Sequence, residues 1–567
     1  MTDKYKGIIA SNGIAMGDIY IYSKEEIKAN QEEIDSSKVD AEIEKFKSAI
    51  KNYFRDLEDR EKTTKEEEEI ANAHKELLQD PFLEETVVNK IKDENKNSEL
   101  ALSETIDEMV TTMSLLDDDY LKERAADYKD IGEQLMYKLK GIKPKNLSKL
   151  DGKCIIISKE LTPSDTSTMD KKNVLGFATD LGGKTSHTSI IAQTLGIPAV
   201  VGMGNISSKV KDGDYAIIDG DSGFILLNPS QEEKEEYTNK IKSLEEEKKR
   251  LDKIKNSTAI TTDGKTIEVS ANIGNLSDLD VAIEAGCDGV GLFRTEFLYM
   301  ENTHFPTEEE QFEVYKKAAE KLEGKPLIIR TLDIGGDKGL DYYEFPKEDN
   351  PFLGYRAIRM CLDKVDVFKT QLRAILRASA FGKIRIMTPM IISVDEVKKT
   401  RKYLEEIKKD LDKENIDYDK NIELGIMVET PASVMMADKI IKYVDFFSIG
   451  TNDLTQYVLA VDRGNENISY LYNTYNPAVL RAIKRTIDES HKAGKWTGMC
   501  GQFALDITAT KLLLGLGLDE FSGTPSNISK VKDTVLNTSL EESKKFAEKI
   551  LDMEDTQEIE RMVIENN

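Results

Sequence analysis

The stretch GVGLFRTEFL, residues 289–298, begins as an apolar run and ends in charged residues, and this pattern decides the fold of the second half of the chain. Similar short apolar runs recur after residue 260, with helical patterns between them. The eight runs are TIEVSANIG, GVGLFRTEFL, PLIIRTLDIGG, KIRIMTPMI, NIELGIMVET, VDFFSIGTND, KWTGMCGQ and LDEFSG. Eight strands that alternate with helices over roughly 250 residues or more predict a (β/α)8 barrel of the TIM type.

Polar side chains end or follow several of these predicted strands. They are Arg294, Glu296, Arg330, Asp333, Glu429, Asn452, Asp453 and Cys500. Because the chemistry of such a barrel lies at the carboxyl ends of its strands, we expect these side chains to face one site. Guanidinium groups match phosphate and carboxylate oxygens with paired hydrogen bonds. One arginine alone would better fit a structural ion pair, but Arg294 and Arg330 together predict a small polyanionic ligand. Arg356 and Arg463 are further candidates for the same site.

Glu429 and Asp453 add two carboxylates to these strand ends. Proteins commonly hold Mg²⁺ through one or two carboxylates, while phosphate oxygens of the substrate and water complete its coordination. The sequence therefore predicts a phosphorylated acid bridged to the protein by Mg²⁺. Cys500 follows the seventh predicted strand, and a thiol with an ordinary pKa of about 8.5 can donate a proton at neutral pH. A buried, inert cysteine is the alternative interpretation.

The first half of the chain has a different character. A strand pattern that ends in GDIYIY is followed by Glu- and Lys-rich sequence with apolar residues at helical spacing, and β-branched runs return from about residue 150. The N-terminal strand is expected to join the later α/β domain, so that the helical region is an insert within it. A stretch that is charged throughout then predicts a solvated linker helix. The predicted divisions are 1–23 with 146–229 for the α/β domain, 24–145 for the helical insert, 230–256 for the linker and 257–567 for the barrel.

The stretch GGKTSHTSI, residues 182–190, resembles a nucleotide-binding loop but has the wrong spacing. Counting back from its GKT triplet, the first glycine of G-x-x-x-x-G-K-[ST] falls on Ala178. A glycine turn, Ser and Thr residues and His187 remain, at the opening of an apolar helix. Helix N-termini attract phosphate, and histidine is a competent covalent nucleophile. His187 is therefore a candidate carrier of a phosphoryl group, although a lone histidine is more often structural.

Composition narrows the class of protein. The chain has 567 residues, of which 39% are hydrophobic, and a formal net charge of -26 from 105 acidic and 79 basic residues. That charge disfavours nucleic acid and anionic membranes as partners. The four cysteines lie far apart and fit neither a disulfide framework nor a zinc site. With neither a signal peptide nor a membrane-spanning run of about 20 apolar residues, the expected location is the cytoplasm.

Seven motifs, in the same order along the chain, resemble one known family. They are GGKTSHTSIIAQTLGIPAVVG, GVGLFRTEFLYM, LIIRTLDIGGDK, NPFLGYRAIR, GIMVETPAS, FFSIGTNDLTQYVLAVDR and GMCGQFALD, and LKERAADYKDIG in the helical region is similar as well. The family is enzyme I of the bacterial sugar phosphotransferase system, the phosphoenolpyruvate (PEP)–protein phosphotransferases. The resemblance covers nearly the whole chain.

The resemblance implies a role for each matching position. PEP would phosphorylate His187, which would pass the group to a histidine of the small carrier protein HPr. Glu429 and Asp453 would hold Mg²⁺, and Cys500 would protonate the departing enolate to give pyruvate. The positions that match the substrate-binding residues are Arg294, Arg330, Arg356, Asn452, Asp453, Arg463 and, beside the phosphorylated imidazole, Thr166.

The resemblance also implies an arrangement of domains. A swivelling phosphohistidine α/β domain would carry His187 between the barrel and HPr, which docks on the inserted helices, and residues 230–256 are the expected hinge. The barrel would form a homodimer. Two glutamines depart from the family: Gln193 stands where an arginine is usual and Gln502 where a glutamate is usual. In addition, SNG replaces the usual SPG near the start, and FSGTPSNI differs from the family's loop after the last strand.

Two other functions compete with this interpretation. A PEP synthase or pyruvate phosphate dikinase shares the phosphohistidine and PEP domains, but it needs an additional nucleotide-binding domain, for which the sequence offers no glycine-rich phosphate loop. A regulator without catalytic activity would keep the fold and bind HPr or a metabolite. The presence of every expected catalytic residue argues against it.

Overall fold

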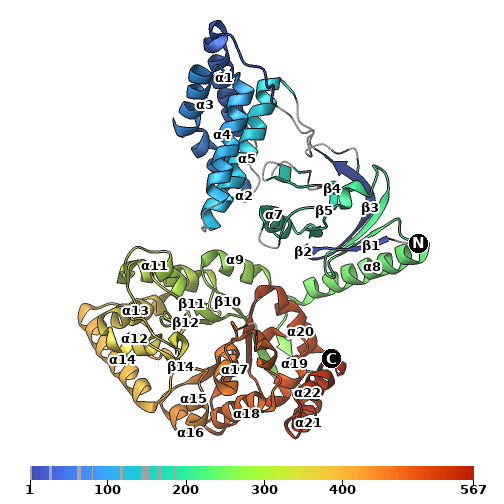
Figure 1. Ribbon diagram of the computed structural model, residues 1–567. Helices are drawn as coiled ribbons and strands as arrows, with labels where there is room; N and C mark the ends of the chain where they lie inside the picture. Colours follow the sequence, from blue (N-terminus) through green and yellow to red (C-terminus); the bar gives the residue numbers. More distant parts are fainter. Residues whose placement is uncertain are drawn as a thin grey trace. The chain divides into compact units, whose positions relative to one another are not determined.

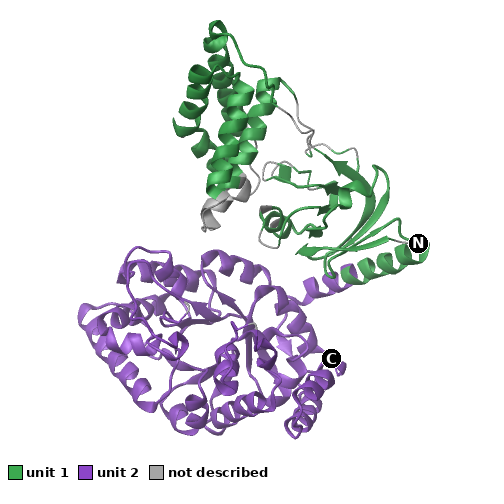
Figure 2. Cartoon of the chain, in the orientation of Figure 1, with its two compact units in different colours: residues 1–244 green, residues 245–567 purple. Residues whose placement is uncertain are grey.

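The computed structural model describes all residues except 1–2, 24–28, 60–64, 80, 115–118, 143–146, 148–149, 151, 163–164, 167–168, 171, 184–185, 337, 466 and 567. The chain forms two compact units, residues 1–244 and residues 245–567 (Figure 2). Among the described residues, no helix is both long enough and apolar enough to cross a membrane.

Unit 1 contains an eight-stranded sheet in the order β1-β8-β7-β3-β4-β5-β6-β2. Its strands are β1 (Asp3–Lys6), β2 (Ile8–Ser11), β3 (Ile14–Tyr22), β4 (Cys154–Ser158), β5 (Val174–Thr179), β6 (Ala199–Val201), β7 (Tyr215–Asp219) and β8 (Phe224–Leu227). The four central strands β3 to β6 run parallel, and the outer pairings are antiparallel. Helix α7 (His187–Leu195) connects β5 to β6.

The single N-terminal strand predicted from the sequence is divided into three. Gly7 separates β1 from β2, and the turn at Gly13, with φ of 108°, separates β2 from β3. Because β1 and β2 occupy opposite ends of the strand order and only Gly7 lies between them, the sheet must curve until its two edges meet. A Cβ at Gly7 would lie 2.6 Å from a methyl group of Val200, so the crossing requires glycine.

Both faces of this sheet are buried. Ile155 and Ile157 of β4 belong to one hydrophobic cluster, while Ile156 belongs to the other, because successive side chains of a strand point to opposite faces. Ala192 of α7 packs into the cluster of Ile156. The run CIIIS therefore lacks the polar alternation of a half-exposed strand.

A bundle of helices is inserted between the neighbouring parallel strands β3 and β4 (Figure 1). Its helices are α1 (Val39–Asp59), α2 (Lys65–Gln79), α3 (Pro81–Glu94), α4 (Ser98–Ser114) and α5 (Asp119–Lys140). They enclose a hydrophobic cluster of their own, centred on residues such as Phe46, Leu102 and Ile131. The predicted helical insert is confirmed.

Helix α8 (Gln231–Ile254) has no buried residue, as its charged sequence predicted, and the boundary between the units falls within it. Its first half is held by Asp219 of unit 1, whose Oδ2 accepts hydrogen bonds from the Tyr237 hydroxyl at 3.1 Å and from Lys240 Nζ at 3.2 Å. Its second half pairs with unit 2 through Arg250 and Asp533 at 2.8 Å.

Unit 2 is a closed barrel of eight parallel strands, which confirms the predicted (β/α)8 fold (Figure 1). The strands are β10 (Thr266–Ile273), β11 (Val290–Arg294), β12 (Leu327–Arg330), β13 (Ile384–Thr388), β14 (Glu423–Val428), β15 (Phe446–Ile449), β16 (Trp496–Met499) and β17 (Glu520–Gly523). Each of the eight runs quoted from the sequence contains one of them. A short strand, β9 (Ala259–Ile260), pairs antiparallel with β10.

Helices surround the barrel. They are α9 (Leu276–Glu284), α10 (Glu296–Met300), α11 (Glu308–Lys321), α12 (Ile358–Asp363), α13 (Val365–Ala378), α14 (Val394–Glu414), α15 (Pro431–Met435), α16 (Ala437–Ile440), α17 (Thr451–Leu459), α18 (Pro477–Lys492), α19 (Thr510–Leu516), α20 (Ile528–Leu536), α21 (Leu540–Leu551) and α22 (Thr556–Glu565). The outward strand residues pack on these helices, and a smaller cluster that includes Leu292, Met387, Phe446 and Cys500 fills the interior. Strand ends thereby present inward side chains to a common opening.

Candidate active site

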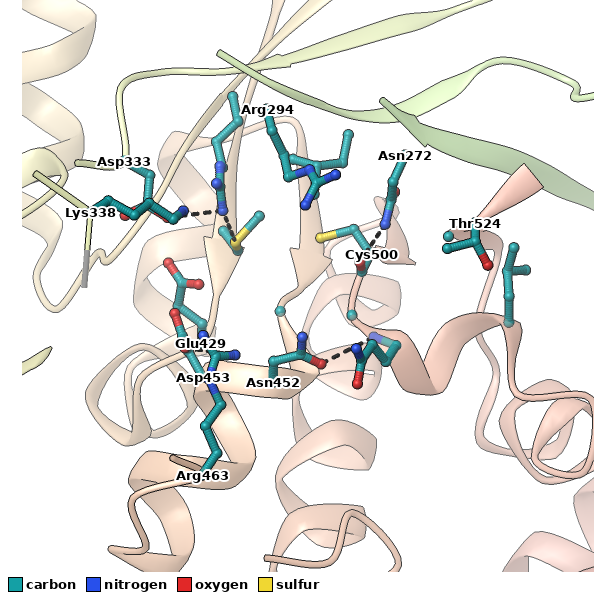
Figure 3. A pocket seen from close by; sticks show the side chains of 18 of the residues that line it. Asn272, Arg294, Asp333, Lys338, Glu429, Asn452, Asp453, Arg463, Cys500 and Thr524 are labelled. Carbon is teal, nitrogen blue, oxygen red and sulfur yellow. Dashed lines mark hydrogen bonds and ion pairs between the residues drawn. The ribbon is translucent and has the colours of Figure 1, made fainter. Parts of the chain in front are cut away.

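A cavity of about 500 Å³ lies at the carboxyl ends of the barrel strands (Figure 3). Eight residues predicted from the sequence line it: Arg294, Arg330, Arg356, Glu429, Asn452, Asp453, Arg463 and Cys500. Each comes from a strand end or from the segment that follows a strand, because the last inward position of each strand points into the opening. Asp333, which was also expected at these strand ends, lines the cavity as well, and the polar lining residues that were not predicted are Asn272, Lys338, Gln502, Thr524 and Asn527.

Arg330 is the most heavily paired arginine of the cavity. Its Nη2 lies 2.6 Å from Glu296 Oε1, and its Nη1 lies 3.0 Å from Asp333 Oδ2. Lys338 shares both carboxylates, at 2.8 Å from Glu296 and 3.8 Å from Asp333. Burial opposes ionisation of Asp333, but the charges of Arg330 and Arg356 outweigh it and hold the pKa of this carboxyl below its usual value. Asp333 is therefore ionised at neutral pH.

A second group of charges surrounds Asp453. Arg356 Nη2 lies 2.9 Å from Asp333 Oδ1 and 3.4 Å from Asp453 Oδ2, and Arg463 Nη1 lies 3.8 Å from Asp453 Oδ1. In the part of the chain that is described, Asp453 Oδ1 accepts no hydrogen bond. Arginine hydrogens that are not fully satisfied by carboxylates remain available for an anion.

Arg294 differs from the other arginines, since among the described residues it forms no ion pair. Its guanidinium lies 5.3 Å from the ring centroid of Phe297, and its buried Nε has no hydrogen-bond partner in the same part of the chain. Arg294 is half-buried, and a partly desolvated cation without a counter-charge is unfavourable. An anionic ligand in the cavity would supply that charge.

Glu429 and Asp453 are two carboxylates whose charges repel each other, so the pair is suited to a divalent cation. Glu429 is buried, its Oε1 accepts a hydrogen bond from the Met390 backbone N–H at 2.5 Å, and its pKa is raised to about 8, first by burial and then by the charges of Asp453 and Asp333. A cation would relieve this repulsion. The described residues form no cluster of three or more His, Cys, Asp or Glu side chains suited to a metal. Two carboxylates are the number expected for Mg²⁺ that also binds substrate oxygens and water.

The Cys500 thiol lies at the inner wall of the cavity, 5% exposed, with its Sγ 3.8 Å from the Ile449 carbonyl oxygen. Burial raises its pKa to about 12, although Ser448 and the charge of Arg330 act in the opposite direction. The thiol therefore stays protonated at neutral pH, as a proton donor must before it acts.

His187 and Thr166 belong to unit 1, whereas every residue that lines the cavity belongs to unit 2. His187 is the first residue of α7, and the Ser186 side chain caps the helix by accepting from the Ser189 backbone N–H. Thr188 Oγ1 donates to the Leu161 carbonyl oxygen at 2.9 Å, which ties the start of this helix to Leu161.

The unusual residue Gln193 has a structural partner in unit 1. Its Nε2 donates a hydrogen bond to the Ala10 carbonyl oxygen at 2.7 Å. Gln502, the other departure from the family pattern, lines the barrel cavity, and its backbone N–H donates to Asn452 Oδ1 at 3.1 Å.

Three family models match the chain. They are the N-terminal domain of PEP-utilising enzymes over residues 6–124, the mobile domain over 150–223 and the PEP-binding domain over 248–540. The PEP–protein phosphotransferase of Buchnera aphidicola subsp. Schizaphis graminum is 47% identical over 98% of this chain and 98% of that protein. The chain belongs to the PEP–protein phosphotransferase family. The resemblance noted in the sequence is thereby confirmed, and the protein is a phosphotransferase enzyme.

The chain is similar to further proteins over different shares of its length. The PEP–protein phosphotransferase of Staphylococcus carnosus is 43% identical over 100% of this chain and 99% of its own length. A solution structure of Enzyme I is 44% identical and matches 42% of this chain and 99% of that one, with a TM-score of 0.38. PEP-utilising enzymes generally depend on a metal ion.

Proposed function

We propose that this enzyme transfers the phosphoryl group of PEP to His187 and from there to a histidine of an HPr carrier, with release of pyruvate. The observation that carries the proposal is the convergence of the eight predicted cavity residues, of which four are arginines, around a volume suited to a small phosphorylated acid. The full-length relatives named PEP–protein phosphotransferase support it.

The arginines would bind and orient PEP. Arg294, which has no carboxylate partner of its own among the described residues, would take an anionic group of PEP, and Arg330 and Arg356 would take phosphate oxygens beside Asp333. Asn452 would donate its amide to the carboxylate, because its Oδ1 already accepts from Gln502 and only Nδ2 is left to donate. Arg463, at the exposed side of the cavity, would complete the set.

Glu429 and Asp453 would hold Mg²⁺. The cation would supply charge neutralisation for the transferring phosphoryl group. The metal requirement can be tested apart from catalysis by measuring binding of Mn²⁺, a spectroscopically visible substitute, to the wild type and to Asp453→Asn.

In the transfer step, a neutral ring nitrogen of His187 attacks phosphorus while the bond from phosphorus to the enol oxygen breaks. The enolate that remains takes a proton at C3 from the Cys500 thiol and becomes pyruvate. Thr166 would then contact the phosphorylated imidazole. Because His187 belongs to unit 1 and the cavity to unit 2, transfer requires the units to meet during the cycle.

The domain roles belong to the same proposal. Residues 1–23 and 146–229 would form the mobile phosphohistidine domain, residues 24–145 would dock HPr, and residues 230–256 would act as the hinge. Residues 257–567 would bind PEP and form the homodimer. The family matches over 6–124, 150–223 and 248–540 support this division. The proposed location of the enzyme is the cytoplasm, which is consistent with a carrier protein as its partner.

The test is incubation of the whole protein with Mg²⁺ and PEP labelled on its phosphate, in the absence of ATP. We expect a protein-bound label that is labile in acid and stable in base, as phosphohistidine is, and that disappears in His187→Ala. That variant should still bind PEP with nearly unchanged affinity, because the residues of the cavity all come from unit 2.

The same assay separates the competing functions. Labelling that requires ATP would indicate a PEP synthase or a dikinase. PEP binding without label or pyruvate release would indicate a regulator, and Gln193 and Gln502 would then be the first positions to change.

A further inference from the structure

The segment that carries Cys500 is hydrogen-bonded on two sides of the cavity (Figure 3). The Cys500 carbonyl oxygen accepts a hydrogen bond from Asn272 Nδ2 at 2.8 Å, and the Gln502 backbone N–H donates to Asn452 Oδ1 at 3.1 Å. The Cys500 backbone N–H also donates to the Ile449 carbonyl oxygen at 3.0 Å. Contacts from β10, β15 and α17 therefore fix the backbone around the thiol.

Gly501 lets this segment approach α17 closely. A Cβ at Gly501 would lie 1.8 Å from Thr451 Oγ1 and 2.6 Å from the Thr451 backbone nitrogen. The segment is thus already as near to the start of α17 as a glycine allows. A displacement of the segment would therefore take it away from α17.

The orientation of the Asn272 amide is determined by its other neighbour. Asn272 Oδ1 accepts a hydrogen bond from Ser522 Oγ at 2.6 Å, so Nδ2 faces the Cys500 carbonyl oxygen. Ser522 is fully buried in β17, the strand that pairs with β10. A rigid pair of strands therefore presents a donor to the Cys500 backbone.

Building on the proposed role of Cys500, we propose that Asn272 is a positioning residue that holds the Cys500 thiol toward one face of the enolate of pyruvate. The S–H bond breaks and its proton goes to C3, the electron pair of the enolate double bond forms the new C–H bond, and the enolate oxygen becomes the ketone. The thiolate that remains takes a proton from water after pyruvate leaves.

Proton delivery depends on this placement more strongly than phosphoryl transfer does. A displacement of about 1 Å in a reacting group can reduce a rate by about 100-fold. The charged residues that would bind PEP are held by other contacts, such as those of Arg330 with Glu296 and Asp333. Loss of Asn272 should therefore impair protonation and leave labelling of His187 nearly intact.

The test uses the whole protein, PEP with deuterium at one of its two C3 positions, and tritiated water. Protonation at one face gives a pyruvate methyl group of one configuration. In the wild type we expect one configuration to predominate. In Asn272→Ala the two should approach equal amounts and pyruvate formation should slow by about 10- to 100-fold. Single-turnover labelling of His187 should stay within about twofold of the wild type.

Two further variants keep the test decisive. Asn527→Ala is the matched control. Asn527 Nδ2 also donates to a backbone carbonyl oxygen of the cavity wall, but to that of Leu505, at 3.0 Å, and not to that of Cys500. Asn527→Ala should therefore give the wild-type configuration. Ser522→Ala removes the residue that orients Asn272 and should shift the configuration in the same direction as Asn272→Ala, by less. If Asn272→Ala does not fold, Ser522→Ala decides.

The inference is overturned if Asn272→Ala keeps the wild-type configuration, or if labelling and pyruvate formation fall by the same factor, as a general loss of structure would cause. Equal amounts of the two methyl configurations in the wild type would also overturn it, together with the acid role of Cys500. Labelled His187 would in that case still support the transfer of phosphate. A wild type that takes up no label would instead contradict the proposed function itself.

Discussion

Arg330 and Arg463 line the same cavity but differ in burial. The Arg330 side chain is 8% exposed and pairs with two buried carboxylates, whereas the Arg463 side chain is 36% exposed and lies 3.8 Å from Asp453. A buried pair that loses one partner leaves an uncompensated charge, while an exposed pair contributes little to stability. The two arginines should therefore affect PEP binding alike and folding differently.

We expect Arg330→Met to weaken PEP binding and to lower the free energy of unfolding by up to about 3 kcal/mol, the low end for breaking a buried ion pair, because Lys338 still pairs with Glu296. Arg463→Met should weaken PEP binding and change the unfolding free energy by less than about 1 kcal/mol. Urea unfolding and calorimetric titration with PEP measure the two effects. Equal losses of stability in both variants would contradict this difference.

Cys500 is expected to act as an acid over the whole working range of pH. A thiol with its pKa raised to about 12 keeps its proton below that pH, so the rate of pyruvate formation should not fall through thiol ionisation between about pH 6 and 9. Cys500→Ala should bind PEP and form pyruvate slowly. A decline of the wild-type rate near pH 8.5, or full activity in the variant, would remove the proposed role.

At the level of the strands, the base of the barrel is built around Glu520, the first residue of β17. Its carboxylate oxygens occupy the space above Gly291 of β11 and Gly498 of β16, where a Cβ would lie 2.0 and 2.1 Å from them. Glu520 is 1% exposed, and burial, followed by the charge of Glu268, raises its pKa well above the usual value. Glycines of two different strands, β11 and β16, thus accommodate an acid inside the barrel.

This acid should make stability depend on pH. Because the folded-state pKa of Glu520 is raised, its stabilising contribution is complete below the unfolded pKa of about 4.3 and is lost as pH rises through the folded value. We expect Glu520→Gln to remove this loss and to be more stable than the wild type at pH 8, by about 1 to 3 kcal/mol. Urea unfolding at pH 5 and pH 8 measures it, with the exposed Glu405→Gln as control. An unchanged pH dependence in Glu520→Gln would be the contrary result.

The strands and the charged side of the cavity could be predicted because both leave local patterns. An apolar run that ends in Arg294 or Arg330 indicates a strand and its ligand-facing end at once. Asn272 and Lys338 were missed because neither ends such a run: Asn272 precedes the last residue of β10, and Lys338 follows a glycine turn beyond β12. Their importance depends on partners far away in the sequence, Cys500 and Glu296 respectively.

For the molecule as a whole, the two units have separate hydrophobic cores, and the cavity belongs to one of them. Sequence patterns predicted the α/β sheet, the helical insert and the barrel, because each has its own periodicity. The closure of the sheet of unit 1 at Gly7 was not predicted, since it depends on pairings with strands far away in the sequence, such as Asp3 with Leu227 and Ile8 with Val201.

Because the two units have separate hydrophobic cores, we expect a ligand to change the stability of each unit separately. In His187→Ala, which cannot take up the phosphoryl group, PEP with Mg²⁺ at about 100 times the dissociation constant should stabilise unit 2 by about 2.7 kcal/mol and leave unit 1 unchanged. Calorimetry should show two unfolding transitions, of which only one moves to higher temperature. A single transition that moves as a whole would mean that the units unfold together.

The insertion of the helical bundle between β3 and β4 has a consequence for synthesis on the ribosome. Tyr22 ends β3 opposite Ser158 of β4, and the sheet is complete only when β8 has been made. At about 5 to 20 residues per second, the N-terminal strands wait roughly 10 to 40 seconds for their partners. During that time the nascent chain exposes unpaired apolar strands, while the bundle, made of local contacts, can already fold. The N-terminal strands, which are made first, are therefore the part of the nascent chain that we expect a ribosome-associated chaperone to bind.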